Sequence, residues 1–516
     1  MTNRVHTLRN TVFSSIGIYT EYFLGMVAAI LIARHLGPQH YGIYSLFIWF
    51  AAIGVVATNS GVTTGVIKFV AELRGSKRED LIVPALVHFR KVQAWHMAVV
   101  VGGGAVLFFV AGHRLIADLN LLEFLLLAAA VGMRAPYMFN IAIAKGFEAF
   151  DATAKITMIA SPLNLLMVIA AMLLKAPLEW FVIVYAISSA MFLLASQLQV
   201  ARLVKPLTRG ESLPDELLRR MRRHLRIVSA TIILSFLIAS DVEILFLNLY
   251  ATPTQAGYFK VAYQLATGVV LLVPGVFGAV LLPMMAKALS EGREIAGRRF
   301  VAATSYLTLL SAPVLAFGIS FAVPIIALLY GNAYAAAAPV FALVILNSGI
   351  STCTQGASSL LVSADRQNTI LLLTVIFGAL KLALDLILVR HFGLYGAVAA
   401  IMSITLISST TYVTIGVRVS GTRLQWRRLS SILAAAVIAS LLALPTFWLH
   451  LKPLWTLLIG GVILSAAYLL MTLLLKCWSG GDIEQLQGLH RRFVGGRPLA
   501  LGKLLAWAGD RSGASR

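Results

Sequence analysis

The chain has 516 residues, of which 59% are hydrophobic and only 12% charged, and its mean hydropathy is +0.87. A water-soluble domain is about half apolar and about a quarter charged, so this composition excludes an ordinary soluble globular protein. The net charge of +21 does not indicate nucleic-acid binding, because the lysines and arginines form short clusters between apolar runs and are not interleaved with aromatic residues.

A transmembrane helix needs roughly 20 consecutive apolar residues, and runs of that kind follow one another along the chain. We therefore predict an all-α polytopic membrane protein with about 14 transmembrane helices. The predicted spans are residues 11–33, 41–70, 91–112, 119–143, 156–175, 178–201, 226–250, 256–284, 301–330, 333–363, 368–390, 393–418, 430–449 and 453–476.

The lysines and arginines predict the orientation of these spans. With the N-terminus in the cytosol, 33 of the 42 basic residues fall on the cytosolic side, five on the opposite side and four within spans. Cytosolic loops of membrane proteins are enriched in lysine and arginine. We therefore expect a multi-pass protein of the bacterial inner membrane with both termini in the cytosol.

The external segments between the predicted spans are short, none longer than about ten residues by the span limits above, and the largest hydrophilic pieces are the cytosolic stretch 202–226 and the tail 477–516. A glycan polymerase or ligase needs a sizeable extramembrane platform for its acid and base groups, which favours a carrier over an enzyme. The sequence has no phosphate-binding G-x-x-x-x-G-K-[ST] motif and no Cys/His cluster with metal-ligand spacing. We predict no catalytic residues, no metal and no cofactor.

Two pairs of similar segments, separated by nearly the same number of residues, indicate that the chain contains duplicated halves. HLGPQHYGIYSLF (35–47) resembles YATPTQAGYFKVA (250–262), with Gly42 and Gly257 aligned 215 residues apart, and residues 148–164 resemble residues 363–381. Repeats around a central site are typical of secondary transporters. The predicted division is an N-terminal lobe (1–201), a basic cytosolic linker (202–225), a C-terminal lobe (226–418), two extra spans (430–476) and a cytosolic tail (477–516).

Four segments, in order, resemble a known family. They are ILIARHLGPQHYGIYSLF (30–47), SDVEILFLNLYATPTQAGYFKVAYQL (240–265), LLYGNAYAAAAPVFAL (328–343) and LVSADRQNTILLLTVIFGALKLALDLILVRHFGLYGAVAA (361–400). They are similar to the Wzx-type polysaccharide flippases of the MOP superfamily, which also contains the MATE drug exporters and the lipid II flippase. The resemblance implies two six-helix lobes around a central cavity, alternating access, and an oligosaccharide substrate linked to undecaprenyl diphosphate.

Charged residues inside a span are costly and are candidates for function. A lipid diphosphate needs cationic donors in a cavity of low dielectric constant, and the candidates are Arg134, Lys260 and Lys68. Arg134 lies deep in its span, where it either lines the cavity or reaches towards the nearer, cytosolic surface. Snorkelling towards the membrane surface is the alternative for Lys260, and snorkelling with an ion pair to Glu72 is the better account of Lys68.

Ion coupling or gating is predicted for Glu21, Asp241, Lys381 and Asp385. Glu21 lies near the middle of span 1. It is expected to be either a proton or cation site or the partner of a basic residue. Asp241 and Glu243, two positions apart on one helix, would point about 200° apart, so Asp241 is preferred and Glu243 is expected to pair with a neighbouring helix. Lys381 and Asp385, four residues apart, form either a self-neutralising pair or a gated one.

The expected function is therefore export of a lipid-diphosphate-linked oligosaccharide for O-antigen, capsule or exopolysaccharide assembly. Its partners would be membrane lipids and, in the pathway, polysaccharide polymerase and chain-length proteins, with no nucleic acid. A MATE-type exporter of hydrophobic cations is the alternative within the same fold, although it predicts a more acidic cavity than this mixture of charges. A glycan polymerase or ligase is the alternative from another class.

Overall fold

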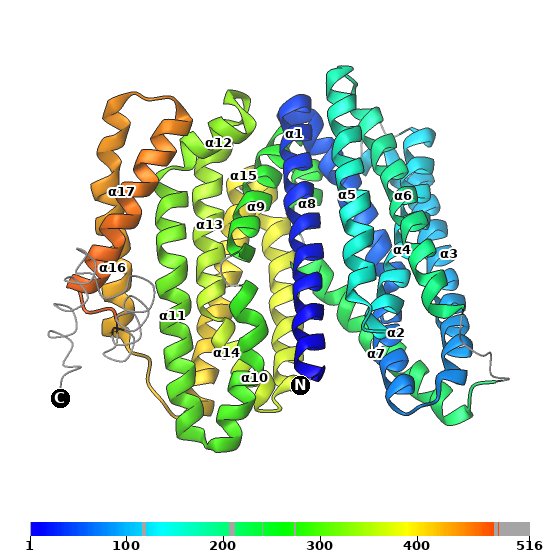
Figure 1. The fold of residues 1–516 in the computed structure, drawn as a ribbon. Coiled ribbons are helices and arrows are strands. Elements are labelled where there is room, and N and C mark those ends of the chain that lie inside the picture. Colours follow the sequence, from blue (N-terminus) through cyan, green and yellow to red (C-terminus); the bar gives the residue numbers. More distant parts are fainter. Residues whose placement is uncertain are drawn as a thin grey trace. The chain divides into compact units, whose positions relative to one another are not determined.

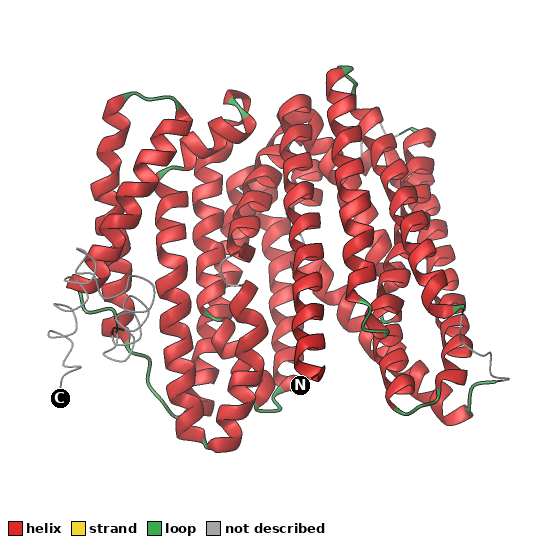
Figure 2. Cartoon of the chain, in the orientation of Figure 1, coloured by secondary structure: helices red, strands yellow, loops and turns green. Residues whose placement is uncertain are grey.

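A computed structural model describes residues 2–115, 120–205, 212–239, 241–272, 275–478 and 483. Every regular element in these residues is a helix, as Figure 2 shows. The α-helices are α1 (Thr2–Asn59), α2 (Val62–Gly75), α3 (Ile82–Leu115), α4 (Leu121–Gly146), α5 (Phe150–Leu173), α6 (Leu178–Val204), α7 (Asp215–Ala239), α8 (Glu243–Tyr250), α9 (Pro253–Leu272), α10 (Gly275–Glu291), α11 (Arg293–Ser320), α12 (Ala322–Tyr330), α13 (Ala337–Cys353), α14 (Gln355–Ser363), α15 (Gln367–Ser420), α16 (Trp426–Ala443) and α17 (Pro453–Leu474). Three short 3₁₀ helices are η1 (Glu79–Leu81), η2 (Asn332–Tyr334) and η3 (Leu444–Leu449).

Ten helices in the described part of the chain are long and apolar enough to cross a membrane. Two of them, a 41-residue stretch of α1 and the 54-residue α15, each cover two predicted spans. Predicted spans 7 and 8 are each built from two shorter helices, α7 with α8 and α9 with α10. The prediction of an all-helical polytopic protein with about 14 spans is therefore confirmed. The predicted tail, 477–516, lies outside the described residues except for its first two positions and residue 483.

The two longest helices are each interrupted by a glycine in the left-handed region. Gly37 in α1 has φ 73°, and Gly393 in α15 has φ 54°. A Cβ on Gly396 would lie only 2.0 Å from the carbonyl oxygen of Leu388, eight residues earlier. In a straight helix these residues would be about 12 Å apart along the axis, so the chain turns back at Gly393 and α15 is a hairpin of two spans.

The helix predicted over 226–250 is broken, and this corrects one prediction. α7 ends at Ala239 and α8 begins at Glu243, while Asp241, between them, has a φ of 25°. The expectation that Asp241 and Glu243 point about 200° apart assumed one continuous helix, and that assumption is wrong. Their directions are set separately by the break, and each carboxylate has its own partner.

The chain forms two compact units, whose helices can be followed in Figure 1. Unit 1 contains residues 1–261 and 377–397, and unit 2 contains residues 262–376 and 398–516. The division into lobes 1–201 and 226–418, joined by a linker at 202–225, stays a prediction. One core of unit 1 is formed by α2, α3, α4 and α7, with Phe69, Phe89 and Met221 almost fully buried.

Unit 2 has a core in which the last two spans take part. Ala435 and Ala439 of α16 and Leu464 of α17 pack with Phe321, and the Tyr468 hydroxyl donates a hydrogen bond of 2.7 Å to the carbonyl of Leu309 in α11. A Cβ on Gly460 would lie 2.3 Å from the ring of Phe321, so glycine is needed for this close packing. Spans 13 and 14 are thus packed against α11 and α12 as part of unit 2.

Candidate functional site

Arg134, in the middle of α4, is the centre of the first group of charges in unit 1. Its Nη2 lies 3.4 Å from Oε1 of Glu21 on α1. The guanidinium carbon is 4.8 Å from the centre of the Tyr137 ring and 4.3 Å from that of Phe192. Both rings are buried, whereas 22% of the Arg134 side chain and 42% of the Glu21 side chain are exposed. Cation–π contacts with two rings hold the Arg134 guanidinium, although the side chain remains partly exposed.

The N-terminal end of α4 is fixed by a capping box. At its start, the side chain of Asn120 accepts a hydrogen bond of 2.8 Å from the backbone of Glu123, whose carboxylate accepts one of 3.0 Å from the Asn120 backbone. This capping box satisfies free N–H groups of the first turn. From there Arg134 is about 20 Å along the helix at 1.5 Å per residue, near the middle of a 26-residue candidate span.

A buried polar network next to Arg134 was missed by the sequence analysis. The Gln93 amide donates to Asn59 Oδ1 at 2.7 Å and to the carbonyl of Ala135 at 3.0 Å, and the Asn59 amide donates to the same carbonyl at 3.2 Å. One turn further along α4, the Asn140 amide donates to Ser196 Oγ at 2.9 Å. The sequence signal for this network was the presence of amide side chains inside apolar spans. The predicted site included only charged residues.

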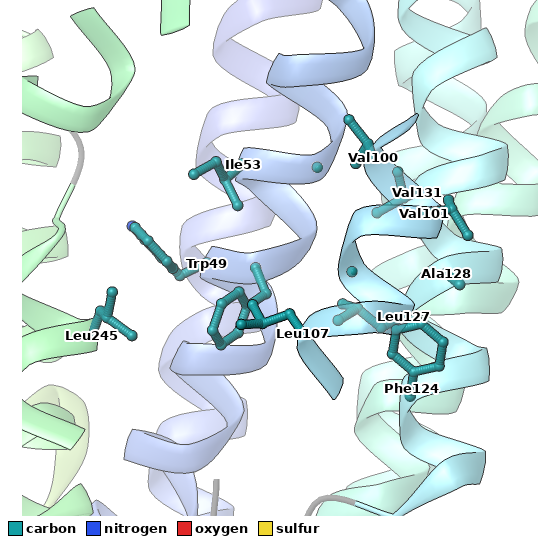
Figure 3. Close-up of a pocket in the computed structure, with 13 residues that line it drawn as sticks. Trp49, Ile53, Val100, Val101, Leu107, Phe124, Leu127, Ala128, Val131 and Leu245 are labelled. Carbon is teal, nitrogen blue, oxygen red and sulfur yellow. The ribbon is translucent and has the colours of Figure 1, made fainter. Parts of the chain in front are cut away.

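An apolar cavity of about 360 Å³ lies between α1, α3 and α4, with Leu245 of α8 contributing (Figure 3). Figure 3 shows the side chains of Trp49, Phe124 and Val131 around it. The thirteen lining residues are all apolar: Trp49, Phe50, Ile53, Gly54, Val100, Val101, Gly104, Leu107, Phe124, Leu127, Ala128, Val131 and Leu245. Val131 precedes Arg134 by three residues, so the cavity lining reaches to within about one turn of Arg134 along α4.

A second group joins α8 to α15. Lys381 Nζ lies 2.5 Å from Oε1 of Glu243 and 3.5 Å from Oδ2 of Asp385, and the exposed fractions of these side chains are 8%, 1% and 0%. The expected pairing of Glu243 with a neighbouring helix is confirmed, and the i,i+4 contact of Lys381 with Asp385 is present. With all three groups ionised, this buried triad carries two negative charges and one positive charge.

A third group is the ion pair between Asp241 and Lys260 of α9, whose side chains are 18% and 20% exposed. The break after α7 places the Asp241 carboxylate where Lys260 reaches it, close to the turn that contains Gly257. Both are predicted site residues, Lys260 for substrate and Asp241 for coupling. The structure brings them together as direct partners.

Lys68 stands apart from these groups, and its expected ion pair with Glu72 is not formed. The Glu72 carboxylate instead accepts two hydrogen bonds, of 2.8 and 3.0 Å, from Arg220 on α7. Bidentate arginine geometry is favoured over a single ammonium contact, which explains the exchange. The Lys68 ammonium lies 5.2 Å from the centre of the Phe69 ring, with the side chain exposed.

The predicted residues thus fall into three ion-paired groups and one exposed lysine. No group of three or more Asp, Glu, His or Cys side chains in the described ranges is arranged to hold a metal ion. Among the predicted residues, Arg134 and Lys260 are the cationic groups suited to a phosphate, and Arg134 lies about one turn along α4 from Val131, which lines the apolar cavity.

Comparison with known proteins places the chain in a family. Residues 31–339, well over half of the chain, match the family described as polysaccharide biosynthesis protein. No curated protein sequence gives a significant match. The solved structure of the lipid II flippase MurJ in an inward closed conformation is similar in fold, with a TM-score of 0.67 and 14% identity over 89% of this chain and 98% of that one.

An inward-facing multidrug resistance MATE family transporter of the MOP superfamily is also similar, with a TM-score of 0.62 and 16% identity over 80% of this chain and 98% of that one. At these identities the likeness concerns the fold. Together with the apolar helices, it makes this a multi-pass membrane protein with a fold like that of these two proteins. The chain belongs to the polysaccharide biosynthesis protein family.

Proposed function

We propose that this protein is a flippase that moves an oligosaccharide linked to undecaprenyl diphosphate across the bacterial inner membrane by alternating access. The oligosaccharide would serve O-antigen, capsule or exopolysaccharide assembly, and its next users would be polysaccharide polymerase and chain-length proteins. Membership of a polysaccharide biosynthesis family and a fold like that of a lipid II flippase support this proposal. The charge asymmetry supports cytosolic termini.

The observation that carries the proposal is the geometry of Arg134. At 3.4 Å its contact with Glu21 is long for a charge-assisted hydrogen bond, which is typically about 2.7–2.9 Å. A diphosphate presents several oxygens to one guanidinium and would compete well with a partly exposed carboxylate. The rings of Tyr137 and Phe192 keep the guanidinium in place during that exchange. Arg134 would therefore bind the substrate's diphosphate.

The apolar cavity between α1, α3 and α4 supports a substrate with a long hydrocarbon tail. Its lining offers no side-chain charge or amide, and it begins about one turn of α4 from Arg134. A headgroup on Arg134 would thus be followed by isoprene units in the cavity. A drug-like cation would gain nothing from the arginine.

The two other groups of charges fit coupling and gating. With all three groups ionised, the buried triad of Glu243, Lys381 and Asp385 carries a net negative charge, and burying an unbalanced charge is costly. Uptake of one proton or monovalent cation would balance it, so its occupancy would respond to an ion gradient. The pair of Asp241 with Lys260, next to a break in the helix, is suited to opening and closing as the helices move.

The test is flipping of a fluorescent undecaprenyl-diphosphate-linked oligosaccharide in proteoliposomes, with accumulation of lipid-linked glycan on the cytosolic leaflet as the readout in cells. We expect Arg134→Gln to lower the flipping rate at least roughly tenfold, and Arg134→Lys to retain part of it. Lys155→Gln, which removes an exposed cation paired with Asp151, is the matched control and should leave the rate unchanged.

Unchanged flipping by Arg134→Gln would contradict the role of Arg134. The exporter alternative would be supported instead if cells with and without the wild-type protein exported glycan equally, while only those with it were protected from cationic drugs. For the triad, Asp385→Asn should abolish the dependence of flipping on a proton or sodium gradient. A gradient dependence that persists in this variant would exclude the triad as the coupling site.

A further inference from the structure

A cavity of about 450 Å³ lies in unit 2, away from the groups described above. Its walls are α11, the linker 421–425 that leads out of α15, and the first turn of α16. The described residues that line it are Arg298, Val301, Ala302, Thr422, Arg423, Gln425 and Arg428. Three of these seven are arginines and none is acidic. The volume falls within the range of small-ligand sites, about 300–1,000 Å³.

The linker that forms one wall is held in a fixed shape. Arg293 donates hydrogen bonds of 2.6 Å to the carbonyls of Val419 and Arg418, which anchors the end of α15 to the start of α11. A Cβ on Gly297 would lie 2.2 Å from Thr422 Cγ2, so α11 and the linker are in close contact. Figure 1 shows this linker as the gold loop that runs to the lower end of α16. The cavity is thus bounded by anchored segments.

The arginines differ in how they are held. Arg428 donates from Nε to the carbonyl of Cys477 at 2.8 Å, and its guanidinium lies 5.5 Å from the centre of the Tyr306 ring. Among the described residues, the acidic partner of Arg298 is Glu294, in an exposed contact of 3.4 Å. Arg423 has no acidic group within 4.0 Å in the described part of the chain. Like charges gathered around a cavity repel one another, and an anion would relieve that repulsion.

We propose that this cavity binds the phosphate of an anionic phospholipid headgroup. The guanidinium groups of Arg298 and Arg423 match the oxygens of a phosphate, which arginine binds in bidentate fashion, and Arg428 adds positive charge beside them. Arg428, in the first turn of α16, lines the cavity, so the positive end of this helix dipole also favours an anion there.

The surface of α16 identifies the anion as a lipid. Leu433, Val437 and Leu441, four residues apart, form an exposed stripe along this helix, with exposed fractions of 53%, 58% and 59%. α16 is a candidate membrane span, and Trp426 at its start is 70% exposed, as expected for an aromatic residue at the membrane surface. A lipid with its phosphate among the arginines would lay its acyl chains along this stripe. A soluble phosphate would make no use of it.

This site is independent of the proposed transport substrate. It lies at the start of the two extra spans, on the side that the charge distribution predicts to be cytosolic. A lipid held there would join α16 to α11 and the end of α15, so we expect it to stabilise the attachment of spans 13 and 14.

The test measures lipid binding to the full-length protein by native mass spectrometry, with dioleoyl-phosphatidylglycerol and dioleoyl-phosphatidylcholine as probes. We expect the Arg298→Gln/Arg423→Gln variant to bind phosphatidylglycerol at least roughly tenfold more weakly, and Arg423→Gln alone to show a smaller loss. Arg423→Lys should recover part of it. Phosphatidylcholine binding should be the same in all of them. Arg428 is left unchanged because it also holds Cys477.

Arg427→Gln is the matched control, since Arg427 is exposed on the same turn of α16 but does not line the cavity. An equal loss in this variant would mean that only general charge matters, and would overturn the proposal. Inorganic phosphate that binds as tightly as phosphatidylglycerol, and through the same arginines, would overturn the lipid assignment. A photoactivatable phosphatidylglycerol should crosslink to the Leu433–Val437 segment; crosslinks found elsewhere would contradict the site.

Discussion

Gly42 and Gly257 are packed against each other's turns in a reciprocal way. A Cβ on Gly42 would lie 1.8 Å from the carbonyl oxygen of Pro253, and a Cβ on Gly257 would lie 2.1 Å from the carbonyl oxygen of Pro38. Each glycine is 215 residues from its counterpart, and so is each proline. Exchanged contacts of this kind are the mark of a two-fold axis. The contact joins the two turns, 35–47 and 250–262, whose sequences resemble each other.

Gly42→Ala should destabilise the protein by about 1–3 kcal/mol, because the added methyl group requires a backbone to move rather than a side chain. Gly257→Ala should have a similar effect. Gly25→Ala in the same helix α1 is the control, since a Cβ there meets nothing within 4 Å, and alanine favours helix. Thermal unfolding in detergent, followed by tryptophan fluorescence, measures the difference. Equal stability of Gly42→Ala and Gly25→Ala would show that the two turns are not in this contact.

Most of the fold could be predicted from the sequence, since a run of about 20 apolar residues is a sufficient signal for a span. The hairpin at Gly393 was predicted as a boundary between spans 11 and 12 for the same reason. The break between α7 and α8 could not be predicted. No glycine or proline lies at 240–242, so nothing in the local pattern marks the end of the helix at that point.

The site was predicted only in part, because ion pairing between distant segments is not visible in sequence. The contact of Lys381 with Asp385 follows from helical spacing, whereas Lys381 with Glu243 and Lys260 with Asp241 depend on tertiary packing. The same limitation explains the error at Lys68. Its neighbour Glu72 is bound by Arg220, 148 residues further on, and a pairing rule restricted to one helix cannot anticipate that competitor.

Cys477 should be unreactive in the folded protein. The residue follows α17 and is fully buried, and burial raises the pKa of its thiol to about 11, in spite of the nearby Arg428. Because the thiolate is the reactive form, N-ethylmaleimide should leave Cys477 unmodified at pH 7.5 in a Cys353→Ser background and modify it after denaturation. A cysteine placed at exposed Ser430 is the control and should react at once. Rapid labelling of Cys477 would show that its thiol is not buried in the core of unit 2.

The same shift predicts a loss of stability at alkaline pH. The raised pKa means that the folded state keeps a proton that the unfolded chain, with a thiol pKa of about 8.5, releases. The contribution of Cys477 is therefore present below about pH 8.5 and is lost as the pH rises towards about 11. Cys477→Ala should show a smaller decline of the thermal midpoint over this window than the wild type. An identical decline in both would contradict the assignment.

His224 should make the attachment of α7 sensitive to acid. It lies before the predicted span 226–250, with its ring 5.8 Å from that of Phe69 and its Nε2 3.3 Å from Thr64 Oγ1. Burial first, and then the charge of Lys68, lower the pKa of His224. The unfolded chain therefore takes up a proton first as the pH falls below about 6.5, and stability is lost there. His224→Gln should reduce the fall of the thermal midpoint between pH 7.5 and 5.5. If the fall is as large as in the wild type, other groups are responsible for it.

Lys381 should be needed to keep two buried carboxylates in the fold. Lys381→Met leaves Glu243 and Asp385 without their shared ammonium at exposed fractions of 1% and 0%. Removing one partner of a buried ion pair costs about 3–5 kcal/mol, whereas replacing all the charges can be neutral. The Glu243→Gln/Lys381→Met/Asp385→Asn variant should therefore be more stable than Lys381→Met alone. Lys287→Met, which removes one partner of an exposed pair with Glu291, should change stability by less than about 1 kcal/mol. If the triple variant unfolds at the same temperature as Lys381→Met, the cost lies in lost packing of the lysine stem and not in the two carboxylates left without their ammonium.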